Sequence, residues 1–157
     1  INWLRKEETY NPDIVVRLLP TTPLQSADDI DKCLEKLFTD KKAQSSVVIA
    51  EARQHPAKSL KLEDNNEGGK YLVSYLTGKG QDVNPTSRHN YEPAYFRANV
   101  IATRVSLIDE TNSLTGDKVQ YHIIPQDRAV DIDTKIDFEL AEYLIKKYKL
   151  DKKNDLS

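Results

Sequence analysis

The apolar residues in the first third of the chain form two short runs, separated by a segment with helical spacing. The runs at residues 14–19 and 46–50 are of strand length and mostly apolar, which is typical of strands covered on both faces. Between them, Ser26 is a suitable N-cap for a helix that reaches about Lys41. The apolar positions of this helix are Ala27, Ile30, Leu34, Leu37 and Phe38. Strand, helix and strand in this order predict a βαβ unit with parallel pairing, and therefore an α/β fold.

The middle of the chain has a different pattern and predicts antiparallel structure. Residues 59–63 and 71–75 flank a polar turn with two glycines, which favours a β-hairpin. The following residues 76–93 are polar and irregular, and a stretch of this length in a small domain usually binds a ligand or packs on a partner. Two further strands are expected at 95–103 and 119–124, with a short helical turn near Leu107 between them.

The last predicted helix is preceded by two closely spaced carboxylates. Thr134 is its expected N-cap, and Asp137 is the expected acidic member of a capping box. In an extended segment, Asp131 and Asp133 lie on one face, where they could share a divalent cation with phosphate oxygens. Carboxylates also occur before helices simply to cap them and to face the helix dipole, so both interpretations of the pair remain open here. The expected buried side of the helix is formed by Leu140, Ala141, Leu144, Ile145 and Tyr148.

A second candidate site follows the first predicted strand. The loop of residues 20–24 contains two prolines that fix its backbone, and the hydroxyls of Thr21 and Thr22 can bond a ligand or the backbone itself. Ligands of parallel α/β sheets bind beyond the carboxyl ends of the strands, where this loop is expected. Stiffening of the loop alone would explain the same residues.

Composition narrows the classes of function. The chain has 157 residues, enough for one domain with a sizeable core, and its net charge of −2 indicates neither a nucleic-acid-binding patch nor a polybasic membrane surface. No apolar run approaches the roughly 18 residues of a membrane span, and no signal-peptide pattern opens the chain. We therefore expect a cytoplasmic protein without nucleic-acid or membrane partners. Cys33 falls on the inner side of the first long helix and is expected in the core rather than as a nucleophile.

Several short motifs are informative as an ordered set. They are Pro20-Thr21-Thr22-Pro23-Leu24, His55-Pro56-Ala57-Lys58, Arg88, Ser113-Leu114-Thr115-Gly116-Asp117, Asp131-Ile132-Asp133-Thr134 and Asp137-Phe138-Glu139-Leu140-Ala141-Glu142. In this order they resemble the acylneuraminate cytidylyltransferases, which are the CMP-sialic acid synthetases and their nonulosonate relatives. Each piece alone is a weak signal, but the set spans nearly the whole chain and corresponds to the C-terminal two-thirds of that family's fold.

The resemblance implies a three-layer α/β sandwich with a mainly parallel sheet, of the nucleotide-diphospho-sugar transferase type. It also implies a small antiparallel dimerisation excursion, which we place at about residues 55–97, where the hairpin and the irregular stretch occur. We therefore expect a single cytidylyltransferase-like domain over residues 1–157 that forms a homodimer.

The resemblance also implies a reaction, the transfer of CMP from CTP to a nonulosonic acid with release of pyrophosphate. Asp131 and Asp133 match the family's metal-binding pair and are the expected catalytic and Mg²⁺-binding residues. Lys58 and Arg88 match positions that reach the sugar, where a cation suits the carboxylate of a nine-carbon α-keto acid. The full expected substrate-binding set is Pro20, Thr21, Thr22, Lys58, Arg88 and Asn99.

Two departures from the family pattern qualify this expectation. Leu19 stands where the sialic acid enzymes commonly have Gln, and a leucine cannot make the hydrogen bonds of that amide. The family's glycine-rich phosphate loop with Arg and Lys is absent, although such a loop does most of the phosphate holding. Since the sequence begins at Ile1, we expect it to be part of a longer chain and inactive on its own. The alternative is a non-catalytic sugar- or nucleotide-binding homologue, or a dimerising partner.

Overall fold

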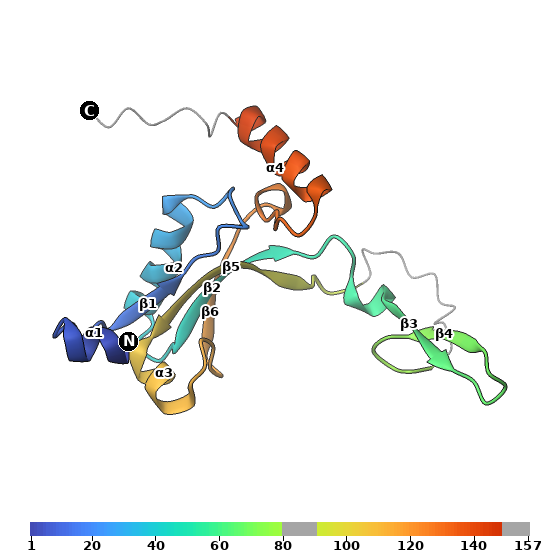
Figure 1. Ribbon diagram of the computed structural model, residues 1–157, viewed down its shortest axis with the longest axis horizontal. Coiled ribbons are helices and arrows are strands. Elements are labelled where there is room, and N and C mark those ends of the chain that lie inside the picture. The colour runs from blue at the N-terminus through green and yellow to red at the C-terminus, as the bar shows by residue number, and fades with distance from the viewer. Residues whose placement is uncertain (80–90, 149–157) are drawn as a thin grey trace. The chain divides into compact units, whose positions relative to one another are not determined.

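The computed structural model describes residues 1–79 and 91–148, with Asn99 described by its backbone alone. The chain forms two compact units, one of Ile1–Ala50 with Arg97–Ser157 and the other of Glu51–Phe96. The second unit overlaps the excursion expected at about residues 55–97. The elements, shown in Figure 1, are α1 (Asn2–Glu7), β1 (Ile14–Arg17), α2 (Ala27–Thr39), β2 (Ser45–Glu51), η1 (Pro56–Lys58), β3 (Leu60–Asp64), β4 (Lys70–Ser74), β5 (Tyr95–Arg104), α3 (Val105–Thr111), β6 (Val119–Ile123), η3 (Gln126–Arg128) and α4 (Lys135–Tyr148).

The main sheet is mixed, with the strand order β1-β5-β2-β6 (Figure 1). β1 pairs antiparallel with β5, and β2 pairs in parallel with β6. The Arg104 N–H donates to the Gln44 carbonyl and the Ala52 N–H to the Ala94 carbonyl, so β5 also runs antiparallel to β2. β1, β2 and β6 therefore share one direction, and their carboxyl ends lie at the same edge of the sheet.

The expectation that the first two strands pair directly is wrong, because β5 lies between them. The βαβ unit is present as a crossover through α2 that skips one strand. β5 is suited to an interior position because both of its faces are buried. Val100 is buried on one face, and Ile101 and Thr103 are buried on the other. In the described sheet β1 is an edge strand, and its four residues are half-buried rather than covered on both faces as expected.

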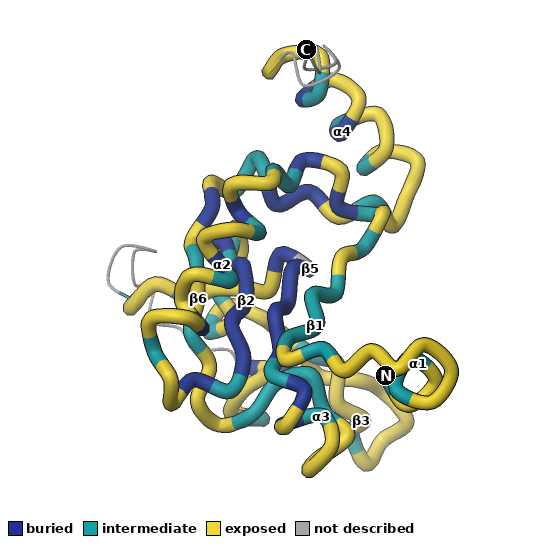
Figure 2. Tube along the Cα trace, turned by 90° about the vertical axis from the view of Figure 1, so that its left-hand side faces the viewer, coloured by how far each residue is buried: buried dark blue, intermediate teal, exposed yellow. Residues whose placement is uncertain are grey.

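The core of the first unit lies between α2 and the sheet. Cys33 and Leu37 of α2 pack in one buried cluster with residues of β2 and β5, namely Val48, Ala50, Ala98, Val100 and Ala102. Figure 2 shows these buried stretches running along β2 and β5. The prediction that Cys33 is a core residue is confirmed, and burial raises the pKa of its thiol. Phe38, expected on the same side of the helix, is instead 58% exposed.

The two faces of β6 differ. Gln120 donates to Asp40, and His122 lies near Asp29, so both side chains face α2. Strand side chains alternate between faces, and the opposite face of β6 carries the exposed apolar residues Val119, Tyr121 and Ile123. No second helical layer covers these three residues in the described part of the chain, and the three-layer arrangement therefore stays a prediction.

Both long helices begin with a capping box, of which the sequence predicts the one at α4 and, at α2, only the N-cap Ser26. At α2, Asp29 N–H donates to Ser26 Oγ while the Asp29 carboxylate accepts from the Ser26 N–H. At α4, the Asp137 carboxylate accepts from the N–H and hydroxyl of Thr134, and Asp137 N–H donates back to Thr134 Oγ1. Asp137 is therefore a cap, as predicted.

Among residues 1–79 and 91–148, none of the helices has the length and apolar character that a membrane span requires.

The exposed end of α4 departs from the prediction. Ala141 and Leu144 are buried as expected, but Tyr148 is 38% exposed. Its hydroxyl donates to the Asp127 carboxylate, a hydrogen bond that keeps the end of α4 beside η3.

The second unit contains the predicted hairpin. β3 and β4 pair antiparallel from Leu60 opposite Ser74 to Asp64 opposite Lys70, which confirms the predicted pairing. The turn is closed by Asn65, whose N–H donates to the Gly69 carbonyl. Gly68 adopts a positive φ of 81°, which explains why a glycine stands at this turn.

Candidate active site

Two stretches that are far apart in the sequence meet beyond the carboxyl end of β1. The Ile132 N–H donates to the carbonyl oxygen of Thr21 at 2.9 Å. Beside this bond, Leu24 packs in a buried cluster with Val130 and with Ala141 and Leu144 of α4. The structure thus brings together the loop of residues 20–24 and the carboxylate segment, which the sequence predicts separately.

Asp131 and Asp133 lie on the exposed side of this segment. Ile132, between them, is half-buried and packs against the Leu24 cluster, an alternation expected of an extended segment. Across residues 1–79 and 91–148, no three His, Cys, Asp or Glu side chains form a group that could hold a metal ion. The pair therefore offers at most part of a ligand set.

The loop of residues 20–24 is held by its own hydroxyl group. Thr22 is buried, and its Oγ1 donates to the Leu19 carbonyl at 2.9 Å, the same oxygen that accepts from the Thr22 N–H. In this structure the Thr22 hydroxyl therefore closes the turn. Pro20 is exposed and Thr21 is half-buried, so these two residues form the accessible part of the loop.

The other predicted substrate-binding residues come from different parts of the chain. Lys58 ends the η1 turn of the second unit and is exposed. That turn is held by His55, whose Nδ1 accepts from the Ala57 N–H at 3.2 Å and whose ring stacks on Tyr91. Asn99 belongs to β5 by its backbone, and Arg88 lies outside the described residues.

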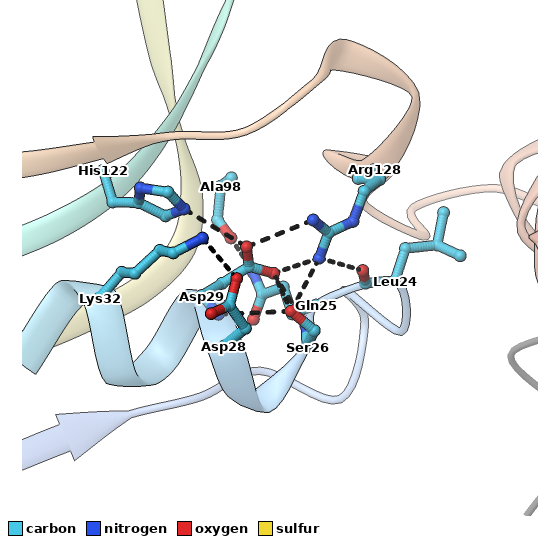
Figure 3. A network of polar contacts seen from close by, with 9 residues as sticks. All are labelled: Leu24, Gln25, Ser26, Asp28, Asp29, Lys32, Ala98, His122 and Arg128. Carbon is cyan, nitrogen blue, oxygen red and sulfur yellow. Dashed lines mark hydrogen bonds and ion pairs between the residues drawn. The ribbon is translucent and has the colours of Figure 1, made fainter.

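A buried ion pair beside the junction is the main feature that the sequence does not reveal (Figure 3). The Asp29 side chain is 1% exposed and accepts hydrogen bonds from Arg128 of η3 and from the Ser26 N–H at 2.9 Å. His122 Nε2 lies 3.4 Å from the other carboxylate oxygen. Arg128 Nη2 also donates to Ser26 Oγ at 3.1 Å and to the Leu24 carbonyl at 3.3 Å. The first turn of α2, the Leu24 loop and η3 are therefore joined by one guanidinium group.

The sequence marks Asp29 only as a first-turn carboxylate, so its partner could not be read from local spacing. Asp29 and Arg128 are 99 positions apart, and only the fold places them together. The signal present in the sequence is the arginine directly before the apolar pair Ala129-Val130, a position where a charge is buried only if it is paired.

Asp29 makes the stability of the protein depend on pH. Burial raises the pKa of this carboxyl, but hydrogen bonds from Ser26 and Arg128 outweigh burial, and the net shift is below the ordinary value of 3.8. A carboxyl with a depressed folded-state pKa stabilises the fold above its unfolded-state pKa, and this contribution is lost as pH falls through the folded value. The Asp29 contribution is therefore complete at neutral pH and disappears in acid.

We predict that Asp29→Asn lowers the urea midpoint at pH 7. The gap to the wild type should narrow as the pH falls below the ordinary carboxyl pKa of 3.8 and close once Asp29 is protonated in the folded state too, at a pH below its depressed pKa. Unfolding curves at pH 7, 4 and 3 measure the gap. Asp31→Asn removes an exposed carboxylate of the same helix and should show little gap at any pH. A wild-type to Asp29→Asn gap that stays constant across this range would contradict the prediction.

Arg17 is a further cation that the sequence interpretation overlooks. It is the last residue of β1, three residues before Pro20, and its Nε is buried with no hydrogen-bond partner. A buried donor left unpaired costs about 1–3 kcal/mol, so Arg17 is a position at which an anionic group would be stabilised. A charge within an otherwise apolar strand was the available signal.

A separate cleft of about 480 Å³ lies between α1, the start of β1 and α3. Arg5 and Asp109 line it and form a paired salt bridge at 2.8 Å, while the Arg104 guanidinium donates to the carbonyls of Leu37 and Ala43. Arg5, Asp109 and Arg104 already have partners within the protein, and we assign no ligand to the cleft.

The chain is similar in sequence to a curated bacterial protein and in fold to a solved structure. No family model matches the chain. The chain is 26% identical over 155 residues to the post-translational flagellin modification protein B of Campylobacter coli, a match that covers 96% of this chain and 61% of that protein. The chain therefore spans about three fifths of the length of this curated relative.

Among solved structures, the chain superposes on CMP:2-keto-3-deoxy-manno-octonic acid synthetase complexed with CTP, with a TM-score of 0.56 at 11% sequence identity. The superposition covers 90% of this chain and 65% of that one. At this identity the match shows a shared fold, which agrees with the expected α/β class.

Proposed function

We propose that the chain serves the transfer of CMP from CTP to a nonulosonic acid. Support comes from its motifs, from the fold that it shares with CMP:2-keto-3-deoxy-manno-octonic acid synthetase, and from its similarity to the flagellin modification protein B. The observation that carries the proposal is the hydrogen bond from Ile132 to Thr21, which holds the carboxylate pair against the loop at the carboxyl end of β1. Open α/β sheets bind their ligands at that edge. Since the chain covers less than two thirds of either relative, the activity is proposed for the complete gene product.

The carboxylate pair fits a Mg²⁺ site in its donor chemistry. Asp131 and Asp133 supply exposed oxygen ligands on one side of the segment, and Mg²⁺ is commonly held by one or two carboxylates plus water and substrate phosphates. When bound, the cation would neutralise charge on the triphosphate.

The chain's own residues contribute mainly positioning. In the proposed step, the anomeric hydroxyl of the sugar attacks the α-phosphorus of CTP, and the bond from this phosphorus to the pyrophosphate oxygen breaks. Charge concentrates on phosphate oxygens, so fixed carboxylates and a rigid loop serve the step by holding groups in place. The Thr22–Leu19 turn fixes the backbone of the loop, which leaves Pro20 and Thr21 to contact substrate.

The sugar acid requires cations, and Lys58 and Arg88 are proposed for its carboxylate, with Asn99 as a further contact. Leu19 is half-buried at the start of the loop and offers no hydrogen bond to the substrate. We therefore expect the preferred sugar to differ from plain N-acetylneuraminate.

The experiment is a pyrophosphate-release assay of the complete gene product with CTP, Mg²⁺ and a panel of nonulosonic acids. We expect release with at least one sugar and loss of release on chelation of Mg²⁺ by EDTA. A folded protein that is silent with every sugar would refute the proposal. If such a protein still binds CTP or a sugar by calorimetry, the alternative of a non-catalytic binding homologue is favoured.

We further propose that the β3–β4 hairpin mediates a homodimer. Leu60 and Leu62 of β3 and Leu72 of β4 lie on one face of the hairpin, and all three are at least 40% exposed. A two-stranded hairpin is marginally stable alone, so an apolar face of this kind is expected to be covered. The occupant that the family resemblance favours is a second copy of the chain.

Leu62→Glu is predicted to shift the protein from dimer to monomer, because it places a charge in the centre of the apolar face. Light scattering over a range of concentrations measures the mass. Lys61→Glu places the same residue on the opposite face and should leave the dimer intact. A wild type that is monomeric at high concentration, or a Leu62→Glu variant that remains dimeric, would contradict this assignment.

A further inference from the structure

Arg128 connects the loop of residues 20–24 to the segment that carries Asp131 and Asp133. Its guanidinium contacts three acceptors within residues 24–29, which are the Leu24 carbonyl, the Ser26 hydroxyl and the Asp29 carboxylate (Figure 3). Leu24 ends the loop, and Arg128 is three residues before Asp131. Three residues span at most about 10 Å of backbone, so a short backbone segment connects Arg128 to Asp131.

This backbone segment is fixed at both ends. Ala129 and Val130 are buried, and Val130 packs on Leu24 in the second core cluster. Beyond them, Ile132 donates its N–H to Thr21. The backbone that carries Asp131 and Asp133 is therefore held at two points, by the Arg128 side chain and by the Ile132 N–H. Both contacts are made to the loop of residues 20–24, at Leu24 and at Thr21.

We propose that Arg128 is a positioning residue, which sets the place of the Asp131–Asp133 carboxylates relative to the loop of residues 20–24 by bridging Leu24, Ser26 and Asp29. Its hydrogen bonds to Leu24, Ser26 and Asp29 fix the start of the backbone segment that leads to the pair, and it acts through this segment. The geometry requires an arginine, because a planar fork reaches several acceptors at once, whereas a lysine ammonium is a compact point charge.

The charge and the bridge of Arg128 can be separated by substitution. A buried carboxylate such as Asp29 needs a paired cation, so Arg128→Met would destabilise the whole unit and report only on folding. Arg128→Lys keeps a positive charge near Asp29 but loses the simultaneous contacts to Leu24 and Ser26. A purely structural ion pair is largely preserved in this variant, while a positioning bridge is lost.

The test is amide hydrogen exchange at Ile132 in the complete gene product. We expect exchange in Arg128→Lys to be roughly tenfold faster than in the wild type, the effect of weakening one hydrogen bond. The Ile124 amide, which donates to Ile49 between β6 and β2, should be unchanged. Arg5→Lys alters the exposed Arg5–Asp109 pair and serves as the matched control, with no change at Ile132. Equal Ile132 exchange in Arg128→Lys, Arg5→Lys and wild type would overturn the proposal.

A second variant and a second readout complete the test. Ser26→Ala keeps the charges of Arg128 and Asp29 and removes the hydroxyl that Arg128 contacts. This variant should also speed exchange at the Ile132 amide, and it decides the test if Arg128→Lys does not fold. The functional arm rests on the proposed CMP transfer, for which Arg128→Lys should raise the Mg²⁺ concentration needed for half-maximal rate more than the KM for sugar. If the wild type releases no pyrophosphate, the proposed function fails, and Ile132 exchange alone decides whether Arg128 positions the segment.

Discussion

Replacing Asp133 with alanine in the complete gene product is expected to slow CMP transfer by at least about 100-fold, a loss of roughly 3 kcal/mol of transition-state stabilisation. The reason is the proposed role of the Asp131–Asp133 pair in holding a cation against the triphosphate. Asp133 is exposed and follows the half-buried Ile132, so the substitution removes a carboxylate without opening the core. Initial rates of pyrophosphate release with saturating CTP and sugar measure the effect.

Two further variants separate charge from shape in this experiment. Asp133→Asn keeps the size of the side chain and removes its charge, and we expect a loss close to that of alanine. Asp31→Asn removes an exposed carboxylate from α2 and should retain the wild-type rate. The metal-binding role is refuted if Asp133→Ala keeps the wild-type rate, whereas a loss shared by Asp31→Asn would indicate a general effect of charge.

Leu24→Ala is expected to destabilise the first unit by about 2–5 kcal/mol, the range for deleting a buried leucine side chain. Leu24 is 1% exposed and stands at the centre of the cluster with Val130, Ala141 and Leu144. A cavity at this point would weaken both the loop and the packing of α4 beside it. Urea unfolding followed by circular dichroism measures the change in the free energy of unfolding.

Leu18→Ala is the matched control for this prediction. Leu18 is 50% exposed and lies in the same stretch of chain, and its truncation should cost less than about 1 kcal/mol. Equal losses for the two leucines would mean that the Leu24 cluster does not contribute to stability as the structure indicates. A larger loss for Leu24 supports the view that this small core supports the candidate site.

The candidate site is only partly predictable from sequence, for a reason that particular residues illustrate. The motifs at Pro20–Leu24 and at Asp131–Asp133 are local, and the structure places their backbones in contact. Thr22 carries a hydroxyl that the sequence assigns equally to ligand or loop, and the Leu19 carbonyl accepts it here. Whether Asp131 and Asp133 bind Mg²⁺, and whether Lys58, Arg88 and Asn99 bind the sugar, stay predictions.

The sequence alone determined which long helices and strands form and where the two long helices begin, because capping residues and apolar periodicity depend on neighbours within a few residues. The N-cap Ser26 and the capping box of Thr134 with Asp137 are such local signals, and both form as predicted. Only the tertiary structure decided that β5 separates β1 from β2, and that Asp29 pairs with Arg128 across 99 positions. Such pairings depend on which buried surfaces and buried charges can be satisfied together, and no local pattern in the chain carries that information.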